Sequence, residues 1–436
     1  MAPDFADESD DWCRRLRACL SRASSAASAE SQLEYMTRAL RCRWLRFAAA
    51  RPSAVYRSPT EAQLESLDGD PLTEAYGYER DLRPTALEAR CAAFFSSPPS
   101  PWSVRHLLFS SGQAALSVAL TMLRQRGVAR SLRVLHLGGY FETAALLAEQ
   151  PSSFAVLTPA DAALADLVVV EPIACDGDFS RVSNVALARV VAGASACRAV
   201  IFDTTLVGRS DPLDAYLRDG VAPHVECVLR ICSGLKLFQQ GMELANFGLV
   251  SCHERAAGAE TRTASATLER LRTLTGAGLR LADTIALEAP WVFDARATAD
   301  YEQAVYANNA RLVAAVQGRN RLFRPITHPE LWGGHAPYCV FRLPDDDASA
   351  LSRLETHLAL TARSRGLVVD KGGSFGFRGH RFEVVCPESD EPPFLRVAMG
   401  RRTGWSCDGF IELMEEVAGQ PHVPPLPAAA DRATVA

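Results

Sequence analysis

Lysine is nearly absent from this sequence. Of its 46 lysine and arginine residues, only Lys236 and Lys371 are lysines. Arginine can replace lysine in most surface roles, but a guanidinium cannot lose its proton or form an imine. A lysine that survives such a bias is therefore a candidate for amine chemistry such as a Schiff base. Lys236 is of special interest because its Gly- and Ser-containing segment runs straight into apolar sequence.

Other features are also missing, and each absence narrows the class of protein. No apolar run reaches the ~18 residues that a membrane span needs, and the acidic start MAPDFADESDDW lacks the basic and apolar regions of a secretory signal. The net charge of -5 argues against nucleic acid or an anionic membrane as the main partner. The 12 cysteines show neither Cys-x-x-Cys nor zinc spacing, which is typical of reduced thiols. We therefore expect a cytoplasmic protein without a metal site.

The apolar pattern predicts four segments. Residues 1–74 are expected to be a helical extension, with Leu33, Met36, Leu40 and Trp44 at three- and four-residue steps, followed by an arm. Residues 75–310 predict a large α/β domain whose mostly parallel sheet lies between helices. Its expected strands are HLLFS, RVLHLG, FAVLT, DLVVVEP, RAVIFD, ECVLRI and FGLVSC. Residues 311–420 predict a smaller α+β domain, and residues 421–436, rich in Pro and Ala, a disordered tail.

Polar residues follow several of the predicted strands, where ligands of open α/β sheets bind. Ser111, Gly112 and Gln113 lie between a strand and an apolar helix. Such a turn suits a phosphate, because it presents free backbone N–H groups and the positive end of the helix dipole. A plain serine cap without a ligand is the alternative.

Two further strand ends carry candidate cofactor ligands. Asp203 closes a very apolar strand, with Thr205 two residues later. A buried carboxylate needs a partner, and a protonated pyridine nitrogen would serve; a turn or helix-cap role is the alternative. Ser233, three residues before Lys236, is a candidate phosphate donor.

A cation near the C-terminus completes the set. Arg396 lies inside an apolar strand, and a buried guanidinium is costly unless it is paired. It either binds a substrate carboxylate through two hydrogen bonds or forms a structural ion pair with Glu383 or another acid. Lys371, in a Gly-containing turn, either touches substrate or is a solvated turn lysine.

In this order, these residues resemble those of fold-type I pyridoxal-phosphate (PLP) enzymes, and within them the Cys/Met metabolism family of cystathionine γ-synthase, cystathionine γ-lyase and methionine γ-lyase. The most specific match is AYGYERDLRPTALEAR, which has the family's Tyr-x-Arg-x-x-x-Pro-Thr pattern at Tyr78, Arg80, Pro84 and Thr85. The resemblance implies that Tyr78 and Arg80 reach the cofactor phosphate of a neighbouring subunit, in a homodimer or homotetramer.

The resemblance, over roughly residues 70–415, implies roles for further residues. Lys236 would carry the Schiff base, and Gly112 and Gln113 would give backbone donors to the phosphate. Tyr140, in LGGYFETAAL, would stack on the cofactor ring, and Asp203 would face its pyridine nitrogen. In the C-terminal part, Arg396 of FLRVAMG would hold the substrate α-carboxylate and Ser374 would lie near the substrate.

The sequence also departs from the family. Leu235 replaces the threonine before the lysine, and the segment after Lys236 reads Leu-Phe-Gln-Gln-Gly-Met. Glu171-Pro172-Ile173-Ala174-Cys175 lacks the family's asparagine near the ring hydroxyl. Phe141 and Glu142 follow Tyr140, where the family has glycine. These changes favour a specialised substrate.

The expected function is γ-elimination or γ-replacement on an L-amino acid with a leaving group at Cγ, in specialised metabolism. Tyr140 and Glu142 are candidate acids or bases near that leaving group, although Glu142 also suits a helix start. Elimination of halide from a γ-chlorinated unsaturated amino acid, giving a terminal alkyne, is one reaction of this kind. A β-eliminating C–S lyase or aminotransferase on the same fold, and a non-catalytic binding protein, are the alternatives.

Overall fold

The computed structural model describes residues 25–50, 82–126, 131–174, 178–210, 212–255, 263–387 and 392–427, with Arg14, Ala18 and Arg80. It divides into two compact units. The large unit is Ala48–Glu302, and the C-terminal unit combines Met1–Phe47 with Gln303–Ala436. The division falls within helix α10 (Ala295–Arg319). The arm expected over residues 51–74 and the tail beyond residue 427 lie outside the described residues.

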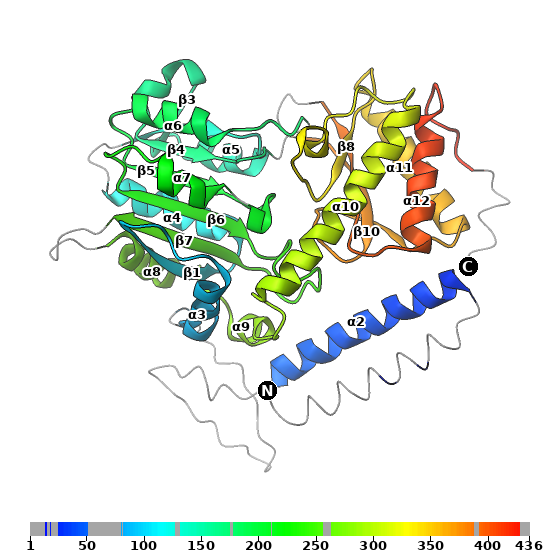
Figure 1. Cartoon of the computed structure of the whole chain (residues 1–436), viewed down its shortest axis with the longest axis horizontal. Coiled ribbons are helices and arrows are strands. Elements are labelled where there is room, and N and C mark those ends of the chain that lie inside the picture. Colours follow the sequence, from blue (N-terminus) through cyan, green and yellow to red (C-terminus); the bar gives the residue numbers. More distant parts are fainter. Residues whose placement is uncertain are drawn as a thin grey trace, which may run out of the picture. The chain divides into compact units, whose positions relative to one another are not determined.

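The large unit is built on a seven-stranded sheet (Figure 1). Its order is β1-β7-β6-β5-β4-β2-β3, and β7 alone among these strands runs antiparallel to its neighbours. The strands are β1 (Trp102–Phe109), β2 (Leu132–Leu137), β3 (Phe154–Leu157), β4 (Leu167–Val170), β5 (Ala199–Asp203), β6 (Cys227–Ser233) and β7 (Gly248–Arg255). Every strand expected from an apolar run is present, so the mostly parallel sheet is confirmed.

Helices cover both faces of this sheet (Figure 1). One apolar cluster joins α4 (Gly112–Arg126) and α8 (Ala264–Thr275) to side chains such as Phe109 and Leu229. A second cluster joins α6 (Asn184–Gly193) and α7 (Leu213–Asp219) to Phe202 and Val228. Because both faces are covered, the interior strand β4 is buried along its whole length and reads as the continuous run LVVV.

The remaining helices of this part of the chain are shorter or lie at its ends. They are α3 (Thr85–Phe94), α5 (Phe141–Ala148), α9 (Leu281–Leu287) and two 3-10 turns at Pro159–Leu164 and Gly208–Ser210. After the last strand of this sheet the chain continues as the helices α8, α9 and α10.

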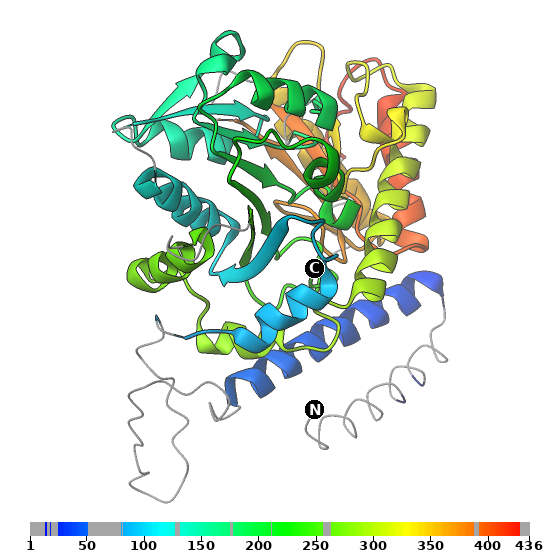
Figure 2. The ribbon, with the colours of Figure 1, turned by 60° about the vertical axis from the view of Figure 1, so that its left-hand side comes forward.

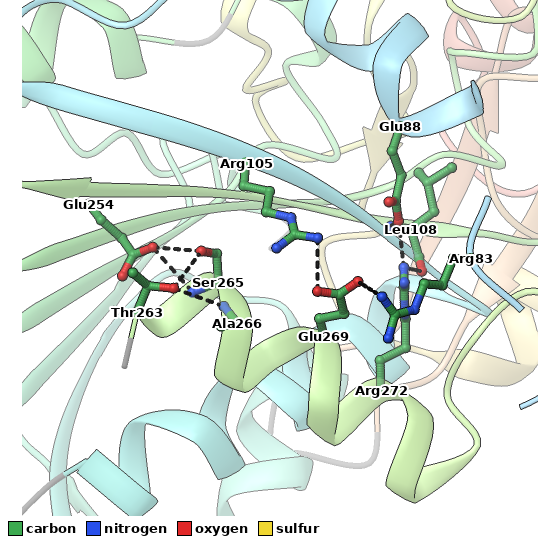
Figure 3. A network of polar contacts seen from close by, with 10 residues as sticks. All are labelled: Arg83, Glu88, Arg105, Leu108, Glu254, Thr263, Ser265, Ala266, Glu269 and Arg272. Carbon is green, nitrogen blue, oxygen red and sulfur yellow. Dashed lines mark hydrogen bonds and ion pairs between the residues drawn. The ribbon is translucent and has the colours of Figure 1, made fainter. Parts of the chain in front are cut away.

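A polar network fixes α8 against the sheet edge (Figure 3). The buried Arg272 guanidinium lies 2.5 Å from Glu88 of α3 and donates to the Leu108 carbonyl of β1 at 2.9 Å. Figure 3 also shows Glu269 facing two arginines, Arg105 at 2.8 Å and Arg83 at 3.4 Å. The Arg272–Glu88 pair is the buried one, and it is costly to break because removal of one partner leaves a buried charge unpaired.

The same helix positions the start of α4. Gly276 ends α8 in the left-handed region, with φ 66°, and the Ala277 carbonyl then accepts the Ser110 N–H at 2.9 Å. Ser110 directly precedes the Ser111-Gly112-Gln113 turn. The position of that turn is thus set from both sides, by β1 and by the end of α8.

The C-terminal unit contains a four-stranded sheet, ordered β8-β11-β10-β9. Its elements are α2 (Ala26–Ala50, up to the division at residue 47), the later part of α10, a 3-10 turn (Pro329–Trp332), β8 (Cys339–Phe341), α11 (Ala348–Ser364), β9 (Val369–Lys371), β10 (His380–Val385), β11 (Phe394–Ala398) and α12 (Trp405–Ala418). Strand β10 is absent from the sequence prediction. Its polar residues His380, Arg381 and Glu383 interrupt the apolar run that would have marked it.

The two faces of this smaller sheet differ. Figures 1 and 2 show α10, α11 and α12 gathered beside it, and their apolar residues pack with Phe341, Phe382 and Leu395. Strand register places Glu383 and Arg396 on the opposite face, because they alternate with those buried residues. This second face therefore carries the ionisable pair, and on it Asp370 of β9 lies 3.4 Å from Arg38 of α2.

Helix α2, from the expected N-terminal extension, belongs to this unit through buried ions. Glu34 pairs with Arg402, and Glu30 accepts the Ser406 N–H at 2.8 Å. Glu30 and Arg402 are both buried. The apolar spacing predicted this helix, and the acids on it decide what it packs against.

Candidate functional site

Five polar segments of the large unit lie at the same edge of its sheet. Strands β1, β2, β4, β5 and β6 are parallel to one another, so their carboxyl ends meet there. They are followed by Ser111–Gln113, residues 138–142, Glu171, Asp203–Thr205 and Ser233–Lys236. The structure thus gathers the residues that the sequence singled out in this unit.

The turn before α4 adjoins the end of β6. The Ser111 hydroxyl accepts the Ala114 N–H at 3.0 Å. A Cβ placed on Gly112 would lie only 3.3 Å from the Ser233 Cβ, which shows how closely the two segments pack. The Thr205 hydroxyl accepts the Ser233 N–H at 3.0 Å. The N-terminus of α4 and these three hydroxyl groups thus lie close together, and the Ser111 hydroxyl also acts as a cap of that helix.

Asp203 is the most perturbed acid at this edge. Its Oδ1 accepts the Thr205 N–H at 2.9 Å. The pKa of the Asp203 carboxyl is raised to about 6, mainly by burial and also by the nearby Glu171, while the hydrogen bonds from Thr205 act to lower it. A carboxylate whose charged form is disfavoured in this way would be stabilised by a cation brought beside it.

Glu171 is a member of the site that the sequence reasoning did not include. It is buried, accepts the Tyr140 N–H at 3.1 Å and the Gly139 N–H at 3.2 Å, and lies 3.0 Å from His136 Nε2. A Cβ on Gly138 would meet the Glu171 Cδ at 2.5 Å. Glu171 thus holds the backbone that carries Tyr140. The available signal was an acid directly after the run LVVV, where only a partnered carboxylate is tolerated.

Tyr140 and Glu142 occupy the start of α5. Tyr140 is its N-cap residue, half-buried, with its ring 5.3 Å from the Phe141 ring. Glu142 is exposed in the first turn and accepts the Gln113 side-chain amide at 3.1 Å. The structure therefore joins two predicted residues 29 positions apart.

Lys236, half-buried, stands in a turn fixed by one amide side chain. Gln239 is fully buried and makes four backbone hydrogen bonds. Its Nε2 donates to the carbonyls of Gly234 and Ala245 at 3.1 and 2.6 Å, and its Oε1 accepts the N–H groups of Leu244 and Ala245 at 2.7 and 3.1 Å. Gln239 so spans the segments on both sides of Lys236.

The loop that Gln239 closes has unusual backbone geometry. Gln240 and Glu243 have positive φ of 51° and 49°, and Gly241 has φ 71°. Such conformations are costly for residues other than glycine and persist where the surroundings impose them. The segment after Lys236, where the sequence departs from the family, therefore forms a loop that the hydrogen bonds of Gln239 stabilise.

The predicted substrate residues lie in the C-terminal unit. Arg396 Nε donates to Glu383 Oε1 at 2.7 Å, and the same oxygen accepts the Ser374 N–H at 3.0 Å. Lys371 is oriented differently, because it pairs with Glu355 of α11 at 2.6 Å on the helix-covered face of the sheet. Arg396 and Ser374 thus share a carboxylate, and Lys371 does not take part.

The remaining predicted residues belong to the family's interface motif. Tyr78 lies outside the described residues, and Arg80 is exposed. Among the residues placed by the structure, no group of His, Cys, Asp and Glu side chains could hold a metal ion, and none of the helices is long and apolar enough to cross a membrane.

Comparison with known proteins identifies the architecture. No family model and no curated protein matches the sequence. Solved structures do match: cystathionine gamma-lyase from yeast has 14% identity and a TM-score of 0.58 over 87% of this chain and 98% of that one. A methionine gamma lyase from Micromonospora echinospora has 18% identity and a TM-score of 0.58, over 86% and 97%.

The chain has the fold of these enzymes. A third similar structure, assigned as an O-acetylhomoserine (thiol)-lyase from Campylobacter jejuni, has 12% identity and a TM-score of 0.55 over 86% of this chain and 98% of that one. It contains N'-pyridoxyl-lysine-5'-monophosphate. The predicted fold class, a fold-type I architecture with a mostly parallel large sheet and a smaller C-terminal α+β part, is confirmed.

Replacing Gln239 tests the loop around Lys236. Gln239→Met keeps the side-chain volume but leaves four backbone groups without their partner, so we expect a loss of about 3 kcal/mol in the free energy of unfolding. Gln240→Met is the matched control, because the Gln240 side chain donates one hydrogen bond, to the Trp291 carbonyl at 2.9 Å. Urea unfolding measures both; equal losses in the two variants would contradict this role for Gln239.

The raised pKa of Asp203 predicts a pH dependence of stability in the ligand-free chain. The folded pKa is about 6, against about 3.9 in an unfolded chain. The folded state therefore binds more protons in this window, and the contribution of Asp203 to stability falls as pH rises from about 4 to about 6.

Asp203→Asn removes this term. We expect the difference in unfolding free energy between wild type and variant to decline over that pH range and then level off. Comparing the two chains cancels other groups that titrate in the window, among them the buried histidines His106 and His253. A difference that does not change with pH would contradict the assignment.

Proposed function

We propose that this chain is a PLP-dependent enzyme that eliminates or replaces a leaving group at Cγ of an L-amino acid. The observation that carries the proposal is one sheet edge holding an amine, a desolvated carboxylate and a helix N-terminus, at Lys236, Asp203 and Gly112. The similar structures support it, since two of them are named as gamma-lyases and a third contains a pyridoxyl-lysine.

The residues present fit the cofactor. A protonated pyridine nitrogen is the kind of cation that would stabilise the charged form of Asp203. The α4 N-terminus, with Ser111, Thr205 and Ser233, suits a phosphate dianion. Tyr140 would lie on the cofactor ring, and Lys236 Nζ would bond to the aldehyde carbon. We propose that Tyr78 and Arg80 serve the phosphate of a neighbouring copy, in a homodimer or homotetramer.

When bound, the cofactor supplies an electron sink for negative charge formed at the substrate Cα. The Lys236 amine would take the proton from the substrate Cα and, once it has passed that proton to the electron sink, one from Cβ. Asp203 would keep the pyridine nitrogen protonated. Tyr140, whose backbone N–H donates to Glu171, would exchange a proton with the leaving group at Cγ, with Glu142 as a second acid or base.

Substrate binding is assigned to the C-terminal unit. Arg396 would hold the α-carboxylate of the substrate through its guanidinium, and Ser374 would lie beside it.

The nine cysteines in the described ranges are free thiols, seven of them buried, which supports a cytoplasmic location.

The two lysines provide a direct test of cofactor attachment. Wild-type protein incubated with PLP should show a visible absorbance band, and borohydride reduction should leave a pyridoxyl group on the Lys236 peptide. Lys236→Ala should lose both the band and the adduct, because the substitution removes the side-chain amine to which the PLP aldehyde would bond. Lys371→Ala is the control and should behave like wild type, since Lys371 pairs with Glu355. An adduct that persists in Lys236→Ala would overturn the proposal.

A substrate panel tests the reaction type. We expect 2-keto acid, ammonia and leaving group to appear together from γ-substituted L-amino acids, with loss of all three in Lys236→Ala. The panel should include a γ-chlorinated unsaturated amino acid, for which formation of a terminal alkyne would identify the specialised reaction. Turnover of β-substituted substrates alone indicates a C–S lyase, and amino transfer to a keto acid without ammonia indicates an aminotransferase. A protein that stays colourless and binds no PLP would favour the alternative of a non-catalytic binding protein.

A further inference from the structure

The guanidinium assigned to the substrate carboxylate already binds a carboxylate of this chain. Glu383 and Arg396 are directly opposite each other on the antiparallel strands β10 and β11. Arg396 Nε lies 2.7 Å from Glu383 Oε1, and Arg396 NH2 contacts the same oxygen. This is the charge-assisted contact that an amino-acid substrate would be expected to make with Arg396.

The Glu383 carboxylate is held in place by more than the arginine. The Ser374 N–H donates to Oε1 at 3.0 Å, and Ser374 has a positive φ of 71°, which turns that N–H within reach. A Cβ on Gly373 would lie 2.8 Å from Glu383 Oε2, so the backbone of this turn approaches the carboxylate closely. Arg396 and the backbone of residues 373–374 therefore form a carboxylate seat, which the Glu383 carboxylate occupies.

The surroundings distinguish this contact from a solvated surface ion pair. The side chains of Arg396 and Glu383 are 16% and 23% exposed, whereas pairs such as Arg311–Asp408 are about half exposed on both sides. The Tyr338 ring lies 5.6 Å from the guanidinium carbon of Arg396. A half-buried pair is screened less by solvent, so removing one partner has a larger effect on the other.

We propose that Glu383 is an internal competitor for the carboxylate seat at Arg396, and that a substrate binds by displacing it. The inference rests on the proposed function, because it takes Arg396 as the substrate's seat. An incoming carboxylate must replace an existing ion pair and gains less than it would from an arginine without such a competitor. The seat therefore selects against simple amino acids and favours those whose side chains add contacts elsewhere.

Glu383→Gln tests the proposal because it keeps the shape and removes the charge. Visible-spectrum titrations of the PLP-loaded chain would use L-norvaline and butylamine, which differ by the carboxylate. We expect the variant to bind L-norvaline about tenfold more tightly, which corresponds to roughly 1.4 kcal/mol, with butylamine unchanged. Asp370→Asn is the matched control, since Asp370 is an exposed acid on β9, on the same face of the sheet, whose ion-pair partner is the exposed Arg38 at 3.4 Å. It should change the binding of neither ligand.

The gain must also depend on Arg396. In Glu383→Gln/Arg396→Gln, the tighter binding of L-norvaline should disappear. The proposal is overturned if Glu383→Gln weakens L-norvaline, leaves it unchanged, or tightens L-norvaline and butylamine equally.

A second measurement does not need the cofactor. Phenylglyoxal modifies accessible guanidinium groups, and peptide mapping can follow the Arg396 peptide alone in the PLP-free chain. We expect modification of Arg396 several-fold faster in Glu383→Gln than in wild type or Asp370→Asn; equal rates would overturn the internal contact. Failure of the proposed function appears separately, as wild-type protein with no visible band and no reducible adduct.

Discussion

The desolvated carboxylate of Asp203 is the constraint on which the candidate site depends. It closes β5 in the middle of a parallel sheet, where burial and the neighbouring Glu171 both disfavour its charge. At the same sheet edge Asp203 accepts a hydrogen bond from the Thr205 N–H, and Lys236 follows the end of β6, the next strand in the sequence. A cation beside this acid would stabilise its charged form, and in the proposed function that cation is the protonated pyridine nitrogen of the cofactor.

Rigidity around that acid comes from buried side chains that bind backbone. Glu171 holds Gly139 and Tyr140, and Gln239 holds both sides of the Lys236 loop. Further out, Arg272 and Glu88 fix α8, whose end positions the α4 turn. Each of these groups is polar and buried, so each is worth most where every hydrogen bond is made. The candidate residues Tyr140 and Lys236 are thus held by residues outside the predicted set.

In the C-terminal unit, the candidate substrate-binding cation is paired with an acid of the same sheet. Arg396 is neutralised by Glu383 across two strands, whereas Lys371, on the opposite face, is paired with a helix. The sequence left open whether Arg396 bound substrate or formed an ion pair with Glu383, and the structure contains that ion pair. Both descriptions hold if the internal carboxylate occupies the seat until a substrate replaces it.

Much of the fold could be predicted from sequence. Seven apolar runs gave the seven strands of the large sheet, because strands covered on both faces must be apolar throughout. Strand β10 could not be found this way, since the face that points away from the helix-packed core carries Arg381 and Glu383. The predicted residues Ser111, Asp203, Ser233 and Lys236 do meet at one edge, because parallel strands end together.

By itself, the sequence determined the order of elements, the candidate amine at Lys236 and the acid at Asp203. Only the tertiary structure decided which carboxylate faces Arg396, that Glu171 supports Tyr140, and that Gln239 closes the lysine loop. The physical reason is that local patterns report whether a residue is buried, whereas hydrogen-bond partners distant in sequence are chosen by the packing of whole strands and turns.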